Sequence, residues 1–305
     1  PNGQDNKSTT YYGEYQYQKQ IENLRLNWTS GIMNEYVNAI SELFNGTNYR
    51  LNNAVYTQFD KKFGKKINLS FGARLEQFKL KTSEYYEMTS GDTINSFKAA
   101  KPVFRAGINY QLAEATFLRT SWGQGYRFPS IAELFIETEV TNGIYVYQNP
   151  QLKPEEGWSS EIAIKQGFKI GQWGGYIDVA GFIMEYENMM EFSFGQWEET
   201  TAENLGIGFR SINIGDTRIS GIEFSVTAGG KLGKDLLNIL GGYTYIDAIP
   251  LNPEIPYGND ANDNQLNYYN TSSLDSNSLF LKYRHKHVAK LDFEYTRGIW
   301  SIGSS

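Results

Sequence analysis

Residues 67–76 read Ile67-Asn68-Leu69-Ser70-Phe71-Gly72-Ala73-Arg74-Leu75-Glu76. Apolar side chains occupy every odd position of this stretch, and polar residues or glycine occupy every even one. Successive side chains of a β-strand point to opposite faces of the sheet. The alternation therefore predicts an extended segment with one apolar and one polar face.

The same alternation recurs along the chain. Clear copies lie at residues 103–112, 161–170, 222–228 and 289–295, and weaker ones around 24–28, 55–59, 117–122, 177–183 and 237–245. We expect about a dozen strands of roughly 10 residues, the length that a tilted strand needs to cross a bilayer. No convincing amphipathic helix competes with them, so the sequence predicts an all-β fold.

The composition fits a membrane barrel without requiring one. Only 40% of the residues are hydrophobic and the mean hydropathy is -0.50, yet 15% are aromatic. Barrel strands face lipid on one side only, which keeps hydropathy low, and aromatic rings collect at both membrane interfaces. A soluble β-sandwich or propeller could have the same composition. No stretch approaches the roughly 18 consecutive apolar residues of a spanning helix, so any span must be made by strands.

The connections between the strands alternate in length. Short joints are expected at residues 61–65, 112–114, 169–175, 229–235 and 296–298, and long irregular ones at residues 83–101, 129–158, 187–208 and 250–278. Outer-membrane barrels have short turns on the periplasmic rim and long loops outside the cell. The pattern predicts a transmembrane antiparallel β-barrel in the bacterial outer membrane, in contact with lipid.

Several functions find no support in the sequence. The net charge is -6 and the basic residues are scattered, so a nucleic-acid partner is not expected. Cysteine is absent, which excludes disulfides, thiolate metal sites and cysteine nucleophiles. No nucleophile elbow, phosphate loop or zinc-binding histidine spacing occurs. We predict no enzymatic activity, no catalytic residue and no cofactor.

Two boxes carry a resemblance to a known family. Residues 121–135, from Ser121-Trp122-Gly123-Gln124-Gly125 to Phe135, resemble the strand-to-loop signature of TonB-dependent receptors. Residues 149–155, Asn149-Pro150-Gln151-Leu152-Lys153-Pro154-Glu155, resemble a second box of that family. Further matches at residues 72–76, 213–223 and 284–295 extend the resemblance over nearly the whole chain. The Tyr- and Asn-rich loops are similar to those of Bacteroidetes members.

The resemblance implies that residues 1–305 are a partial barrel domain. Family barrels have about 22 strands, a preceding plug domain with a TonB box, and a terminal aromatic residue. The plug and the last strands are not found in this sequence, and no signal peptide is visible at Pro1. We therefore expect a fragment of the receptor, whose unpaired sheet edges would need further strands.

The resemblance also implies active uptake of a scarce nutrient complex. A ferric siderophore is the first expected cargo, and cobalamin or an oligosaccharide are alternatives. The implied partners are the TonB complex, reached through the plug, a small-molecule cargo such as a metal chelate, and a surface lipoprotein. A passive porin, an outer-membrane barrel enzyme and a soluble all-β binding module remain as rival interpretations.

Five residues are the candidate cargo-binding positions. Loop aromatic side chains offer a large contact area at low entropic cost, and Arg127 belongs to the first family-like box, where it could instead organise the loop base through charge-assisted hydrogen bonds. The candidates are Tyr126, Arg127, Tyr145, Tyr147 and Trp197.

The metal-binding candidates are weak, and we predict no metal site. Asp260 and Asp263 lie in a polar loop that could hold Ca²⁺, but it lacks the full EF-hand pattern and a solvated loop is favoured. His285 and His287 would share the lipid-facing side of a strand, which disfavours a ligand role. The basic positions on the opposite face of that strand are better explained by structural ion pairs; they are Lys282, Arg284, Lys286 and Lys290.

Overall fold

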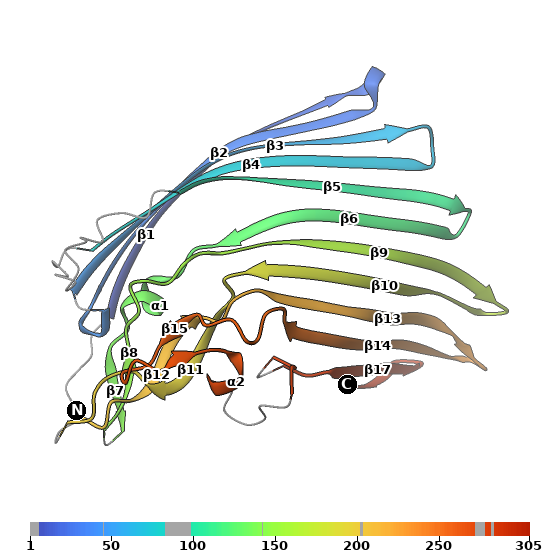
Figure 1. Cartoon of the computed structure of the whole chain (residues 1–305). Helices are drawn as coiled ribbons and strands as arrows, with labels where there is room; N and C mark the ends of the chain where they lie inside the picture. Colours follow the sequence, from blue (N-terminus) through green and yellow to red (C-terminus); the bar gives the residue numbers. More distant parts are fainter. Residues whose placement is uncertain are drawn as a thin grey trace.

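A computed structural model describes residues 6–44, 46–82, 99–141, 143–201, 204–271, 278–281 and 284–305 of the chain. Its main feature is a twelve-stranded sheet that curves as a wall (Figure 1). All neighbouring strands of this sheet are antiparallel. The prediction of an all-β antiparallel fold with about a dozen strands is confirmed.

The strands of the wall follow chain order, with the smaller elements inserted between them. In spatial order they are β1 (Asn6–Ile21), β2 (Leu26–Ser41), β3 (Gly46–Phe63), β4 (Ile67–Thr82), β5 (Ala99–Ala113), β6 (Thr116–Arg127), β9 (Glu155–Ile170), β10 (Trp173–Glu187), β13 (Thr217–Leu232), β14 (Asp235–Pro250), β17 (His287–Arg297) and β18 (Trp300–Ser304). Most are longer than the roughly 10 residues that the sequence pattern predicted, because they continue past the alternating segments, as β4 does to Thr82.

The two rims of the wall differ, as the connection lengths predicted. On one rim the strands are joined by tight turns, including the 3-10 helix η1 (Glu22–Leu24) and turns at Gly64 and Gly233, whose φ of 60° and 68° suits glycine. The longer connections meet at the other rim, together with the 3-10 helix η2 (Glu42–Phe44) (Figure 1). Most of the long connection expected at residues 83–101 lies outside the described residues.

The expectation that the long connections are irregular was wrong for the three that the structure describes. Two of them fold into a four-stranded sheet in the order β11-β12-β8-β7, and a third contains a short hairpin. The elements are α1 (Ile131–Phe135), β7 (Thr138–Thr141), β8 (Ile144–Tyr147), β11 (Met190–Gln196), β12 (Ile207–Asn213), β15 (Gly258–Asn259), β16 (Gln265–Leu266) and α2 (Tyr268–Thr271). Among the described residues, no helix is long and apolar enough to cross a membrane.

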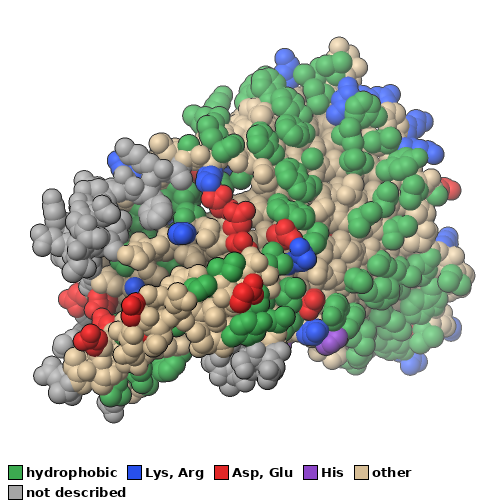
Figure 2. Space-filling view, viewed as in Figure 1, with side chains coloured by type: hydrophobic (Ala, Val, Ile, Leu, Met, Phe, Trp, Pro, Cys, Tyr) green, Lys and Arg blue, Asp and Glu red, His purple; other side chains and the backbone are tan. Residues whose placement is uncertain are grey.

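The wall has one apolar face and one polar face. Side chains of the apolar series are exposed, for example Phe71 at 48% and Ile162 at 59%. Residues in register on neighbouring strands continue the apolar series, since Phe59 pairs with Phe71 and Phe71 with Ala106. In Figure 2 hydrophobic side chains cover much of the sheet, while Lys and Arg gather at the short-turn rim. The wall therefore has the outward apolar band of a membrane barrel.

The polar face holds the first strands together through side chains that reach across Gly31. The Tyr56 hydroxyl on β3 donates to Glu14, at 2.5 Å from its Oε1, and to Oε1 of Gln16 at 3.1 Å, both on β1. The tyrosine ring passes over Gly31 on β2, where a Cβ atom would collide with the ring and its hydroxyl. The absence of a side chain at Gly31 thus permits a link between strands that are not neighbours.

We expect Gly31→Val to lower the thermal unfolding midpoint of the protein in detergent. The added side chain would displace Tyr56 and cost about 1–3 kcal/mol, as overpacking does. Gly13→Val is the matched control, because a Cβ atom at Gly13 meets no atom within 4 Å. Equal midpoints for the two variants would show that the Tyr56 link contributes nothing to stability.

The end of the chain corrects one expectation about the histidines. β17 begins at His287, so His285 lies outside the strand and does not share its face. The Nδ1 atom of His287 lies 2.8 Å from the Tyr243 hydroxyl, within an aromatic group. Ion pairs join Lys286 to Asp247 and Lys290 to Asp292, at 3.8 and 3.1 Å, which supports structural pairing. Lys282 lies outside the described residues.

Candidate functional site

The long connections are held over one rim by two small hydrophobic cores. The first core comprises Tyr147, Met189, Trp197, Ile212, Ile214, Ala248, Tyr268 and Leu281. The second comprises Phe78, Leu80, Leu134, Phe135, Leu152 and Met190. Each core combines residues from several connections with residues from strand ends. We call these packed connections, residues 128–154, 188–216 and 251–286 as far as they are described, the loop layer.

Helix α1 anchors the loop layer to the wall. Its N-cap, Ser130, accepts a hydrogen bond from the Glu133 N–H at 3.1 Å, and the Glu133 carboxylate accepts one from the Ser130 N–H at 2.7 Å. This reciprocal pair is a capping box. Burial acts to raise the pKa of Glu133, but the hydrogen bonds from Ser130 and Arg127 outweigh it and hold that pKa below its ordinary value.

Arg127 connects this helix with two other elements. Its Nη1 donates to both Glu133 oxygens at 2.7 and 2.9 Å, and its Nε donates to Oε2 of Glu155 at 2.6 Å. The other Glu155 oxygen accepts the Met190 N–H at 2.6 Å. One guanidinium thus joins β6, α1 and β9, and Glu155 extends the network to β11. This geometry supports the interpretation that Arg127 organises the loop base.

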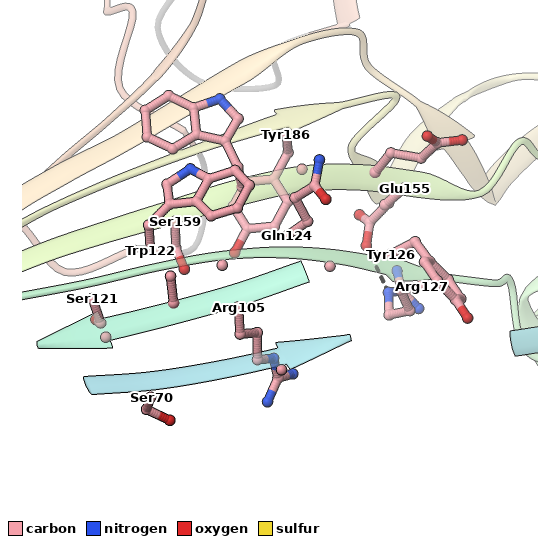
Figure 3. Close-up of a pocket in the computed structure, with 18 of the residues that line it drawn as sticks. Ser70, Arg105, Ser121, Trp122, Gln124, Tyr126, Arg127, Glu155, Ser159 and Tyr186 are labelled. Atoms are coloured by element: carbon pink, nitrogen blue, oxygen red, sulfur yellow. Dashed lines mark hydrogen bonds and ion pairs between the residues drawn. The ribbon is translucent and has the colours of Figure 1, made fainter. Parts of the chain in front are cut away.

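A cavity of about 740 Å³ lies beside this network, and Tyr126, Arg127 and Glu155 line it. Figure 3 shows the aromatic residues Trp122 and Tyr186 on the same lining as the Arg127–Glu155 ion pair. Many of the residues that line the cavity are small, which leaves space at the wall; they are Ser70, Gly72, Gly107, Ser121, Gly123, Gly125, Gly157 and Ser159. The volume falls within the range of small-molecule sites.

The remaining candidates lie apart from this cavity, in the loop layer. Tyr145 and Tyr147 are adjacent on one face of β8, with ring centroids 6.0 Å apart. The Tyr147 hydroxyl donates to Oδ1 of Asn204 at 3.1 Å, and Nε1 of Trp197 donates to the Gly208 carbonyl at 3.0 Å. Tyr147 and Trp197 are buried, at 7% and 8% exposure, so most of their surface packs within the protein.

A second cavity, of about 430 Å³, opens between the three connections of the loop layer. Trp197 lines it, together with residues that the sequence interpretation did not single out. The polar ones among them include Lys153, Asn188, Arg210, Asp216 and Asn252. Lys153 lies in the second family-like box, but no local motif places it beside the other residues, because long-range contacts assemble the cavity, such as the hydrogen bond from the Lys153 N–H to Oδ1 of Asn213 at 2.9 Å.

The carboxylates considered for Ca²⁺ take part in local hydrogen bonds. Asp260 Oδ1 accepts the N–H groups of Asn262 and Asn264 at 2.9 and 2.8 Å, and Asp263 Oδ1 accepts from Nδ2 of Asn259 at 2.6 Å. Nδ2 of Asn264 also donates to Oδ2 of Asp260, at 2.9 Å, and this bond contributes most to holding the pKa of Asp260 below its ordinary value. In the part of the chain that the structure describes, no three His, Cys, Asp or Glu residues converge on one point.

Comparison with known proteins identifies relatives of this architecture. The model of the family described as "TonB dependent receptor-like, beta-barrel" matches residues 2–305. A double mutant of the Serratia marcescens hemophore receptor HasR, solved with its hemophore HasA and heme, is similar with a TM-score of 0.66 at 14% identity, over 98% of this chain and 51% of that one.

Two other similar solved structures are named for different cargoes. The copper transporter OprC is similar with a TM-score of 0.63 at 16% identity, and the ferric-catecholate import receptor Fiu of E. coli K12 with 0.62 at 16%. Each match covers 98% of this chain, against 42% and 43% of the respective receptor. The chain thus spans about half the length, or less, of these structures. At such identities the likeness establishes the fold alone.

Proposed function

The chain belongs to the family of TonB-dependent receptor β-barrels, and on this premise we propose that it forms part of an outer-membrane receptor for active uptake. In this proposal the strands span the outer membrane, the loop layer captures a nutrient complex outside the cell, and energy relayed through a plug domain opens a path. A ferric siderophore is the first cargo to test, with cobalamin or an oligosaccharide as alternatives.

The observation that carries the proposal is the order of the loop layer. Three connections share hydrophobic cores and enclose a cavity, with its base fixed to the wall by Arg127 and Glu155. A passive pore does not need an ordered loop layer, whereas a receptor that must bind scarce cargo needs preorganised loops. The cavity of about 740 Å³ at the wall adds a place where cargo could lie against the polar face.

Tyr126, Arg127, Tyr145, Tyr147 and Trp197 take two kinds of role in this proposal. Tyr126 lines the wall cavity and contacts cargo there, and Tyr145 is the aromatic residue of β8 that is not buried. Arg127, Tyr147 and Trp197 position the binding surface, because hydrogen bonds and packing already engage most of their polar atoms. TonB and a surface lipoprotein are the proposed protein partners.

The test is growth of a deletion strain complemented with the full-length gene. Ferric siderophores, heme, cobalamin and glycans are supplied one at a time as the limiting source, in backgrounds with and without TonB. We expect complementation to restore growth on one class of source, and only when TonB is present. Restoration without TonB would favour a passive channel, and equal growth on every source with and without the gene would remove the uptake proposal.

A further inference from the structure

The loop-layer cavity contains a partly buried cation that forms no ion pair with the described residues. Arg50, Arg74, Arg210 and Arg218 are the described arginines that are partly buried. Three of them form ion pairs, with Glu35, Glu76 and Glu185, at 2.7, 2.8 and 2.6 Å. Arg210 forms none with the described residues.

Arg210 contacts neutral groups that do not replace an ion pair. Its Nε donates to the Gln148 carbonyl at 3.0 Å, and its guanidinium carbon lies 5.7 Å from the centre of the Trp197 ring. Burial lowers the pKa of Arg210, and the charge of Glu198 offsets this only in part. Glu198 itself accepts a hydrogen bond from Nδ2 of Asn204 at 3.2 Å. Holding an arginine in such a place without a carboxylate costs free energy unless an anion binds there.

Other polar groups line the same cavity and have no hydrogen bond or ion pair from their side chains to the described residues. Lys153 adds a second positive charge, Asp216 adds one carboxylate, and Asn188 and Asn252 add amides. Together with Arg210, these groups carry a net formal charge of one positive charge. Amides and a carboxylate bind hydroxyl groups well, and a planar guanidinium binds a carboxylate in two parallel hydrogen bonds.

We propose that this cavity binds a carboxylate that neighbours hydroxyl groups, with Arg210 and Lys153 as the anion-binding residues. The inference rests on the proposed uptake function and assigns a chemical class to the cargo. Two sources have this chemistry, a hydroxycarboxylate metal chelate and an acidic sugar. In either case Arg210 binds the carboxylate, Asp216 and the amides bind the hydroxyl groups, and Trp197 supports the guanidinium from behind.

Calorimetric titration of the full-length protein in detergent tests this assignment, with citrate, ferric citrate, glucuronate and glucose as probes. We expect at least one of the three anionic probes to bind and glucose to bind at least about tenfold more weakly, as one lost charge-assisted contact implies. Ferric citrate alone would identify the chelate source, and glucuronate alone the acidic sugar. Comparable binding of glucose, or no binding of any anion, would overturn the proposal.

Two variants and a control locate the site. Arg210→Gln should weaken binding of the anionic probe at least about tenfold without lowering the thermal midpoint. Lys153→Gln, at an exposed side chain, should weaken binding of the anionic probe several-fold. If Arg210→Gln is unstable, the affinity of Lys153→Gln alone tests whether the anion binds in this cavity. Arg25→Gln, at an exposed arginine on the opposite rim, should leave the affinity unchanged. Equal affinities for Lys153→Gln, Arg210→Gln and the unmodified protein would overturn the proposal.

The growth assay described above separates this inference from the uptake function. A transporter that supports TonB-dependent growth but shows no preference for anions would contradict the cavity assignment alone. A protein that binds citrate or glucuronate through Arg210 but supports no uptake would contradict the uptake function alone.

Discussion

Phe71→Arg should destabilise the protein by about 2–4 kcal/mol, because it places a charge on the lipid-facing surface of β4. Phe71 is 48% exposed on the apolar face, between its register partners Phe59 and Ala106. Near the bilayer centre the charge of an arginine on this face can be neither buried in protein nor hydrated by water. The measurement is the free energy of unfolding in lipid bilayers, from a urea titration.

The neighbouring residue provides a control at the same depth. Ser70 lies one position away, so its side chain points to the polar face, where it lines the wall cavity of about 740 Å³. Ser70→Arg should cost less than about 1 kcal/mol, since water can reach the new charge there. Phe71→Leu, which keeps an apolar side chain, should also be mild. If Ser70→Arg were as damaging as Phe71→Arg, the assignment of the two faces would be wrong.

Arg127→Ala should release the base of the loop layer. The substitution leaves Glu133 and Glu155 close together without their shared cation, and the Glu155 side chain is only 12% exposed. Removing one partner of a buried ion pair costs about 3–5 kcal/mol; because the Arg127 side chain is 48% exposed, we expect about 2–3 kcal/mol. Amide hydrogen exchange of residues 128–154 should accelerate accordingly, while exchange in the strands stays slow.

Arg218→Ala is the matched control for this experiment. Among the described residues Arg218 forms an ion pair only with Glu185, at 2.6 Å, and both side chains are partly exposed. Its loss should cost at most about 1 kcal/mol. Adding Glu155→Gln to Arg127→Ala should restore part of the protection, because the unpaired carboxylate is removed. Equal exchange in Arg127→Ala and Arg218→Ala would mean that the network does not anchor the loop layer.

The alternating pattern predicted the wall well because strand faces follow directly from residue order. The prediction missed β1, since its outward series is built from Tyr11, Tyr15 and Tyr17 instead of aliphatic residues. Tyrosine counts as neither clearly apolar nor clearly polar in such a pattern. The prediction also placed the next strand slightly too early. The strand expected around residues 24–28 begins only at Leu26, after η1.

The loop layer could be predicted only in part. The role of Arg127 at the loop base was indicated by the family-like box, whereas the capping box of Ser130 and Glu133 emerged only from the structure. The four-stranded sheet depends on a parallel pairing of β8 with β12, whose residues Tyr145 and Gly208 are far apart in the chain. Arg210 gains its burial from the same pairing, which is why no pattern marked it.

The placement of the wall in the outer membrane is tested most directly by labelling single cysteines. The chain contains no native cysteine, so each introduced thiol is unique within it. Asn262, in the loop layer, and Lys234, in a tight turn of the opposite rim, are both exposed. A membrane-impermeant maleimide should label Asn262→Cys on intact cells, and Lys234→Cys only after the outer membrane is permeabilised. Labelling of Lys234→Cys on intact cells, with Asn262→Cys protected or labelled equally, would contradict this account.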